Sequence, residues 1–508
     1  AKAGVSYHIG REANSTYGET LNGIRAETPH HQFTVAVDPY VKPGDAASGL
    51  LPFIQSGDGG KPGDGDRSVQ AYNYRLCFTT NAENRLTMAP PPGYDAKKYE
   101  LLGRYFEALV SSNKNPRLGQ FWNPIWMPNQ KTDINNNGGF STDFIGSNYN
   151  YPEADYATRD KIAREHENYI RGFIHYVANS PRVPEAVRTE MQKWGPCKDE
   201  FVETGGWPRE MYVREARRMI SDVVMSEKHC RSQEVFTDSV GLAAYNMDSH
   251  NCQRIVKNGR VENEGDVQVP PMKPYAVSYR SIVPKADQCI NLFVPVCLSS
   301  SHIAYGSIRM EPVFMILAQS AATAASMAID AKIPVQKVDY DALRKRMLAD
   351  KQILEWTGPA RTAGGKFIDP KSLTGIVLDD KDGTQTGHWQ EGSTLAWRVG
   401  SGYLHDGNAE KGAMKIVYTP EIPVAAEYEI VFFASPASNR ANNVPITVAI
   451  DGKEAKTVKI DQRDAKSAGA FTLGKFQLPK GRATTVTISN QGTEGHVIAD
   501  GVQFVPVK

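Results

Sequence analysis

The sequence lacks an excess of charge of either sign. Its 58 basic and 57 acidic residues leave a formal net charge of +1, so it has no strong field to attract nucleic acid. No apolar run approaches the roughly 20 residues that a membrane span needs. The sequence therefore predicts a protein without a nucleic-acid partner and without a membrane span.

Metal-binding and redox cysteine motifs are missing too. No CxxC pair occurs, which argues against a zinc ribbon or a thioredoxin-type site, and we predict no metal site. Cys297 lies in an apolar run and is predicted to be a core thiol. Cys230 and Cys252 could form a disulfide, which their spacing does not decide. The six cysteines are Cys77, Cys197, Cys230, Cys252, Cys289 and Cys297.

The start of the chain is not typical of a signal peptide. It reads AKAGVSYHIGREANSTYGE and has no initial Met. We therefore expect a processed or truncated chain.

The first 150 residues are rich in loops, with strand-like runs at 31–37 and 72–80. A helical apolar pattern follows from 152 and is expected to end at Ser180-Pro181. A second helix is predicted to begin at Pro184, a residue suited to a first helical turn.

Residues 275–355 read as the end of an α/β unit. The stretch 275–284 alternates like a strand, and the continuously apolar 290–298 predicts a strand covered on both faces. A helix at about 310–328 is apolar nearly all round, which predicts that it lies inside the protein. A second helix is expected at about 339–354, and 356–371 reads as a linker.

Residues 372–508 have the sequence pattern of an all-β domain. The Asp451-Gly452 pair is typical of a hairpin turn. Short strands with regular turns predict a β-sandwich of jelly-roll type. The strands are expected at about 394–399, 413–418, 427–434, 444–450, 456–460, 470–477, 483–489 and 497–505.

Several stretches of the sequence resemble two known families. SYRSIVPKADQCINLFVPVCLSSSHIAYGSIRMEPVFMILAQSAATAA resembles the C-terminal core of a bacterial FAD-dependent oxidoreductase family, some members of which are labelled xanthan lyase. GREANSTYGETLNGI, YVREARRM and DSVGLAAYNMDSHNCQR fit the same family. The tail GSGYLHDGNAEKGAMKIVYTPEIPVAAEYEIVFF resembles a golvesin-like domain. The resemblance implies an oxidoreductase core over 1–355, with a substrate-facing part at roughly 25–270.

One departure from this family concerns the nucleotide. Members normally begin with a strand and a GxGxxG turn that holds the ADP part of FAD. That segment is absent here, and we interpret the glycines of SGDGGKPGDGD at 56–66 as a surface loop. We therefore expect weak FAD binding by this chain alone. Either the segment was cut away, or it is a separate chain, or this chain is a remnant.

The resemblance implies FAD as the cofactor, with the 310–328 helix aiming its N-terminus at the flavin. The alternative is a buried core helix without a ligand. Arg309, directly before the helix, would add positive charge. The implied cofactor-binding residues are Ser300, Ser301, Tyr305, Gly306, Arg309, Met310, Arg11 and Glu12.

Flavin-dependent oxidation needs a base near the substrate proton, and histidine suits neutral pH. His250, with Asp248 two residues away, and His302, after the apolar run, are the candidates. Arg280 and Arg75 lie in strand-like apolar surroundings, where they could clamp a carboxylate or the flavin. Each of these residues could instead be structural.

The predicted function is FAD-dependent oxidation of a sugar or polysaccharide-derived alcohol. The alternatives are a polysaccharide lyase and a non-catalytic glycan-binding protein. We expect a carbohydrate partner and an exported location, which follow from the resemblance and not from composition.

Overall fold

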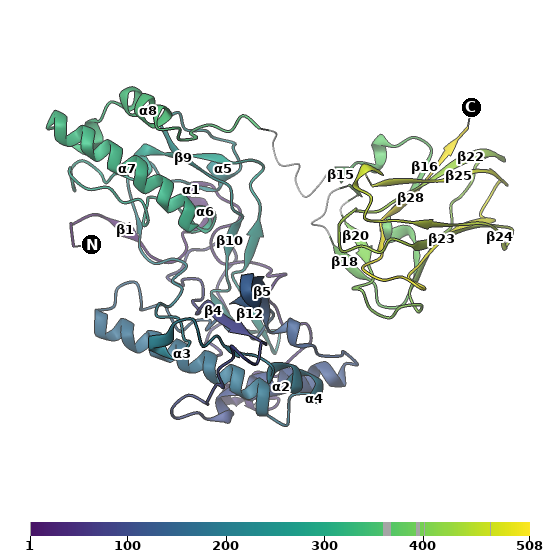
Figure 1. The fold of residues 1–508 in the computed structure, drawn as a ribbon, viewed down its shortest axis with the longest axis horizontal. Helices are drawn as coiled ribbons and strands as arrows, with labels where there is room; N and C mark the ends of the chain where they lie inside the picture. The colour runs from purple at the N-terminus through teal and green to yellow at the C-terminus, as the bar shows by residue number, and fades with distance from the viewer. Residues whose placement is uncertain (1, 359–366, 393–396, 401, 468, 508) are drawn as a thin grey trace. The chain divides into compact units, whose positions relative to one another are not determined.

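The computed structural model describes residues 2–358, 367–392, 397–400, 402–467 and 469–507. The chain divides into two compact units, Ala1–Gly358 and Pro359–Lys508 (Figure 1). Part of the predicted linker, 359–366, and part of the predicted strand at 394–399 lie outside the described residues.

The first unit has two hydrophobic cores. One lies between α2 (Glu100–Ser111), α3 (Tyr156–Asn179), α4 (Glu185–Met191) and a four-stranded antiparallel sheet. The Asp155 side chain caps α3 by accepting from the Thr158 N–H, and the helix ends two residues before Pro181, as predicted. The sheet order is β5-β6-β4-β7, with bounds Asn123–Met127, Lys131–Asn135, Leu76–Thr79 and Gly195–Pro196.

The second core contains three helices: α6 (His302–Ile308), α7 (Glu311–Ala331) and α8 (Tyr340–Ala349). Figure 1 shows α7 and α8 beside β9, away from α2 and α3. The strand pairs of this half are β9 (Ser239–Ala243) with β14 (Tyr275–Ser278), and β10 (Met247–Ser249) with β13 (Val267–Val269).

Short elements join the two halves. β1 (Tyr7–His8) pairs antiparallel with β8 (Arg218–Met219). The hairpin of β11 (Gln253–Lys257) and β12 (Arg260–Glu264) places Val261 in the first core. The remaining elements of this unit include α1 (Asn14–Tyr17), β2 (Tyr40–Lys42), β3 (Asp45–Leu50) and α5 (Glu227–Cys230).

The predicted strand at 290–298 does not form. Its backbone makes scattered hydrogen bonds, such as Val294 N–H to the Ile282 carbonyl, instead of a ladder. Ile290 is 52% exposed, and Cys297 is exposed and therefore not the predicted core thiol. An apolar run shows which side chains favour burial. Among the described residues, however, no element covers the 290–298 segment on both faces. The predicted strand at 31–37 is also absent.

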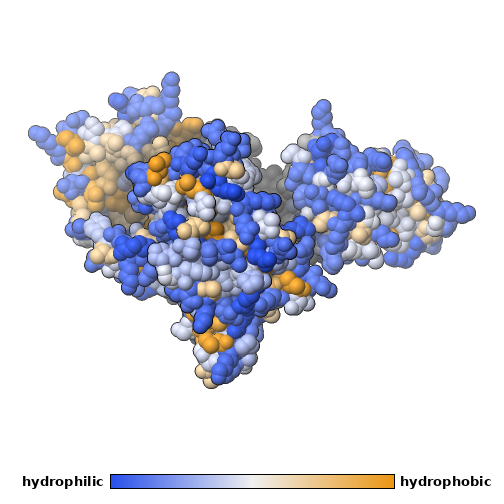
Figure 2. All heavy atoms as spheres, turned by 60° about the horizontal axis from the view of Figure 1, so that its bottom comes forward, coloured by the Kyte–Doolittle hydropathy of each residue, from blue (hydrophilic) through white to orange (hydrophobic). Residues whose placement is uncertain are grey.

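Helix α7 forms where predicted but is not fully inside. Its buried face packs on the second core through Val313, Leu317, Ser320, Ala321, Ala324 and Ala328. Its other face exposes Met315 (72%) and Ile329 (73%). Figure 2 shows hydrophobic residues gathered on the side of the unit where α7 lies in Figure 1. By length and composition α7 could cross a membrane, so the absence of a membrane span stays a prediction.

The second unit is all-β, with sandwich-like sheets around one core. A four-stranded sheet has the order β16-β28-β22-β25, and a five-stranded sheet has the order β17-β21-β26-β23-β24. Asp451 and Gly452 both have positive φ, 51° and 73°, in the turn between β23 and β24, which confirms the predicted hairpin. A jelly-roll topology stays a prediction. The main strands are β16 (Ile376–Leu378), β17 (Thr384–Thr386), β21 (Lys415–Tyr418), β22 (Ala426–Phe433), β23 (Val444–Ile450), β24 (Lys453–Ile460), β25 (Ala470–Leu478), β26 (Thr484–Ser489) and β28 (Gly501–Pro506).

Gly306→Ala tests the close packing of α6 on β10. A Cβ at Gly306 would lie 2.5 Å from the Asp248 carbonyl oxygen, so the backbone must shift. We expect the free energy of unfolding in urea to fall by about 2 kcal/mol or more. Gly119→Ala is the control, since nothing lies within 4 Å of its added Cβ, and should change stability by less than about 0.5 kcal/mol. Equal effects of the two substitutions would contradict this packing.

Candidate functional site

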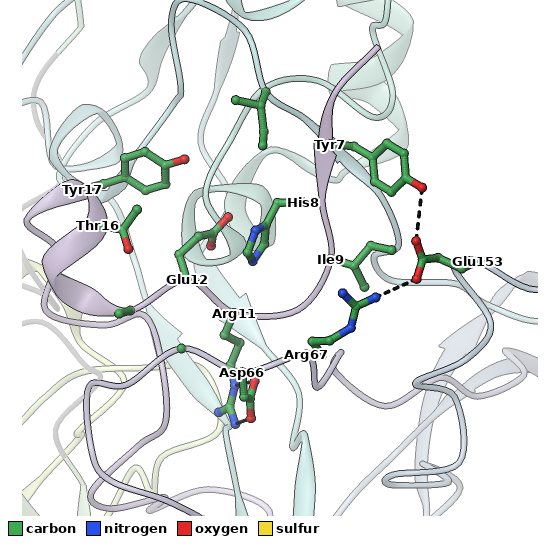
Figure 3. A pocket seen from close by; sticks show the side chains of 13 residues that line it. Tyr7, His8, Ile9, Arg11, Glu12, Thr16, Tyr17, Asp66, Arg67 and Glu153 are labelled. Atoms are coloured by element: carbon green, nitrogen blue, oxygen red, sulfur yellow. Dashed lines mark hydrogen bonds and ion pairs between the residues drawn. The ribbon is translucent and has the colours of Figure 1, made fainter. Parts of the chain in front are cut away.

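An open pocket of about 740 Å³ lies beside β1 (Figure 3). Its walls come from four places in the chain. Residues 7–17 form one wall, the loop at 65–67 forms another, and Glu153 and Ile220 complete it. Glu153 accepts hydrogen bonds from Tyr7 (3.2 Å) and Arg67 (2.6 Å), which ties two of these walls together.

His8 lines this pocket, and sequence reasoning missed it. Its strand neighbour is Arg218 on β8. Burial lowers the pKa of His8, and the opposing effect of the Glu12 carboxylate does not cancel it. The neutral imidazole is therefore the predominant form at pH 7. Its Nε2 is buried and finds no hydrogen-bond partner among the described residues.

Glu12, beside His8 in Figure 3, is a firmly ionised carboxylate. Burial alone would raise the pKa of Glu12, but the Arg218 guanidinium and the backbone N–H of His302 lower it to about 2. Glu12 Oε1 lies 2.7 Å from Arg218 Nη2, and Oε2 accepts from His302 N at 2.9 Å. A carboxylate held by a cation and a backbone donor stays charged at every physiological pH.

Arg11 fixes the floor of the pocket. Its guanidinium donates to Asp66 (2.6 Å) and Glu264 (2.7 Å), and the residue is 1% exposed. Since Nε and both Nη atoms donate to protein oxygens, Arg11 is committed to structure.

His302 lies behind the pocket wall. Its Nδ1 is 2.8 Å from a Glu215 oxygen, and its Nε2 is 3.0 Å from the Ser249 hydroxyl. Glu215 also pairs with Arg218 at 3.1 Å. Both imidazole nitrogens are thus engaged in a buried network, which orients His302 but leaves it no free nitrogen.

His250 belongs to a second buried network. Its Nδ1 is 2.8 Å from Asp143, which Arg214 also contacts at 3.0 Å. Burial lowers the pKa of His250 and Arg214 adds to this, although Asp143 opposes it. Asp248 lies 3.8 Å from His250 Nε2 and accepts from Arg309 at 2.9 Å.

Most predicted site residues come together around α6 and β10. Ser301 caps α6 and donates to Glu19 at 2.6 Å. Tyr305 is buried on the same helix and Gly306 lies against Asp248.

The two strand arginines lie apart from this cluster. Arg280, predicted in apolar surroundings, has a 53% exposed side chain that pairs with Asp238 at 2.9 Å. Arg75 pairs with Asp133 on the first core's sheet.

The two ends of α6 carry buried polar atoms that a flavin could satisfy. Ser300 Oγ and Arg309 Nε are buried and have no hydrogen-bond partner among the described residues. Met310, the N-cap of α7, is half-buried and makes no side-chain cap. These donors suit the polar edge of an isoalloxazine. The described chain contains no GxGxxG turn for the pyrophosphate, and no cluster of three or more metal-ligating side chains among its described residues.

The comparisons with known proteins identify a family for each of the two units. The chain belongs to the FAD dependent oxidoreductase family, whose model matches residues 1–347. The Golvesin C-terminal domain matches residues 376–506. The resemblance to both families is therefore confirmed.

Individual relatives share only part of their length with this chain. A xanthan lyase from Bacillus sp. (strain GL1) is 33% identical over 148 residues, which are 28% of this chain and 16% of that protein. The structure of Paenibacillus xanthan lyase is 30% identical, covers 26% of this chain and 13% of its own, and has a TM-score of 0.25. A family 35 carbohydrate binding module from Clostridium thermocellum is 15% identical over 26% of this chain and 94% of its own, with a TM-score of 0.20.

Glu12→Gln tests the charge network through pH. The pKa of Glu12 is about 2 in the folded chain against 4.5 ordinarily, so its stabilisation is present above pH 4.5 and is lost as the pH falls toward 2. We expect the stability gap between the wild type and Glu12→Gln, measured in urea, to shrink by about 3 kcal/mol over that window. The exposed Glu190→Gln is the control and should show no such change. A constant gap for Glu12→Gln would refute the network.

Proposed function

We propose that this chain forms the substrate-binding part of an FAD-dependent oxidoreductase that oxidises an alcohol of a sugar or polysaccharide fragment. The observation that carries the proposal is His8. It is a neutral imidazole on the wall of a pocket of about 740 Å³, and its buried Nε2 has no partner among the described residues. A buried nitrogen of this kind calls for a hydrogen-bond donor. Since Nε2 has no exposed surface in this structure, the imidazole would have to turn toward the pocket before a substrate hydroxyl could supply that donor.

His8 would accept the proton of that hydroxyl. General-base catalysis requires a neutral imidazole within hydrogen-bond reach of the proton. The imidazolium that forms is stabilised by the Glu12 carboxylate, whose effect on His8 is to raise its pKa. Glu12 can do this because Arg218 and the His302 N–H keep it ionised. Tyr17, Thr16 and Arg67 offer further polar groups to the remaining hydroxyls.

When bound, FAD would supply the acceptor for the hydride that leaves the carbon bearing this hydroxyl. The residues of this chain that would hold it are Ser300, Arg309 and Met310. Ser300 is close to the pocket, because its carbonyl accepts from Arg218 at 3.1 Å and Arg218 is the strand neighbour of His8.

The other predicted catalytic residues act in this proposal as positioning groups. His302 holds Glu12 through its N–H and links Glu215 to Ser249. Asp248 on β10 pairs with Arg309 at the end of α6, and His250 lies 3.8 Å from the Asp248 carboxylate. Arg280 has no role in this pocket.

The carbohydrate substrate and the exported location rest on the comparisons. The golvesin domain and the partial identity to xanthan lyase support a glycan context. Two alternatives share that context, a polysaccharide lyase and a non-catalytic glycan-binding protein. Visible flavin absorbance of the purified protein supports the oxidoreductase, whereas absorbance from unsaturated uronate products on acidic polysaccharides supports a lyase.

A nucleotide-binding segment is the partner that we propose for the exposed face of α7. Met315 and Ile329 on this helix, and Ile290 and Val296 on the adjoining run, are all exposed. The run 290–298 has the composition of a strand between two covering layers, so a segment that supplies such layers suits this surface.

Met315→Glu and Ile329→Glu test this surface. In a complex of this chain with a nucleotide-binding segment, both substitutions should reduce the flavin retained per protein after gel filtration, because a charge in an apolar interface is unpaired. Asp330→Asn, exposed at the far end of α7 from Met310, is the control. Unchanged flavin content in the two Glu variants would count against the docking surface.

His8→Gln tests the proposed base. We expect kcat for a sugar alcohol to fall by about 10²–10⁴-fold with flavin content unchanged. The inflection on the low-pH side of the profile of kcat against pH, where the base becomes protonated, should disappear. His30→Gln is the matched control, because His30 is exposed and near in sequence. A His8→Gln variant that retains wild-type kcat and pH profile would remove His8 from the mechanism.

A further inference from the structure

Cys77 and Cys197 face each other across two paired strands of the first core. The register of β4 and β7 pairs Thr79 with Gly195 and Phe78 with Pro196, so Cys77 lies opposite Cys197 at the next position. The Cys197 N–H donates to the Cys77 carbonyl at 3.1 Å. The two Sγ atoms are 3.7 Å apart.

This geometry suits a covalent link. Directly opposed residues in a hydrogen-bonded antiparallel pair have Cα atoms about 5.5 Å apart. Disulfides are found at Cα separations of about 4.4–6.8 Å. A side-chain rotation can therefore close the remaining gap without moving either strand.

We infer that Cys77 and Cys197 form a disulfide when the protein meets an oxidising thiol–disulfide couple such as glutathione disulfide. The link would tie the central strand β4 to the segment that follows β7. Lys131 on β6 already holds that segment by pairing with Asp199 at 2.9 Å and with Glu200. The inference is independent of the flavin and of His8.

The chemistry balances with one external disulfide. Cys77 is partly exposed, so its thiolate attacks one sulfur of glutathione disulfide, and one glutathione leaves and takes up the proton that Cys77 lost. The Cys197 thiolate then attacks the Cys77 sulfur and displaces the second glutathione, which takes up the proton from Cys197. Two protein thiols are oxidised, and one external disulfide is reduced to two thiols.

The other cysteines provide internal controls. All six lie within residues 2–358, and no second pair of sulfurs in that range is in contact. Cys230 and Cys252, whose pairing the sequence left open, are both fully buried. Cys297 is exposed and Cys289 donates to Asn291 at 3.3 Å.

The test is peptide mapping of the full chain after incubation with glutathione disulfide, alkylation of the remaining thiols and trypsin digestion. We expect a cross-linked pair of peptides, Leu76–Arg85 with Trp194–Lys198, that dithiothreitol separates. In Cys197→Ser we expect Cys77 to carry glutathione instead. The inference is overturned if Cys77 and Cys197 stay alkylated, or each carries its own glutathione, while exposed Cys297 has reacted.

Thermal unfolding gives a second readout that does not depend on peptide recovery. The cross-link closes a long loop, so the oxidised wild type should melt several degrees above the reduced form. The Cys77→Ser/Cys197→Ser double variant should melt at one temperature in both conditions. A redox-dependent shift that persists in the double variant would assign the effect to other cysteines.

Discussion

The buried guanidinium of Arg218 is the interaction on which the candidate site depends. It is fully buried, donates to Glu12 at 2.7 Å, and pairs with Glu215 at 3.1 Å. It also contacts the carbonyls of Gly10 and Ser300. One side chain thus joins β1, β8 and the entrance to α6. Removing a partner from such a buried set leaves an uncompensated charge, which costs about 3–5 kcal/mol.

The chemistry of the pocket follows from this arrangement. Arg218 keeps Glu12 ionised, and burial keeps His8 neutral, so an acceptor and a stabilising anion lie together on one wall. Networks of this kind are costly to build, because each ion loses its hydration. Strongly perturbed groups beside a pocket are more often functional than those elsewhere. Ser300 Oγ and Arg309 Nε, which have no hydrogen-bond partner among the described residues, lie at the two ends of α6, where our proposal places the cofactor.

The regular elements could largely be predicted from the sequence. Helices α3 and α7, the hairpin at Asp451-Gly452 and most strands of the second unit follow from local periodicity and turn residues, which act within a few positions of the chain. The strand predicted at 290–298 was wrong, because an apolar pattern does not show whether other elements cover both faces of the segment. His8 and Asp143 gave no local signal, since their surroundings depend on residues from distant segments. Arg218 folds against Glu12 next to His8, and His250 folds against Asp143. His302 was named because it follows the apolar run at 290–298, and its neighbours Ser300, Ser301 and Tyr305 were named because of the family resemblance.

The most direct test of the central claim is ¹⁵N NMR of the His8 imidazole across a pH titration of the full chain. We expect His8 to stay neutral at pH 6.5, the ordinary pKa of histidine, and its Nε2 resonance to shift when a sugar alcohol is added. A His8 that is already mostly protonated at that pH would contradict the neutral base. So would an Nε2 resonance that does not respond to saturating sugar alcohol.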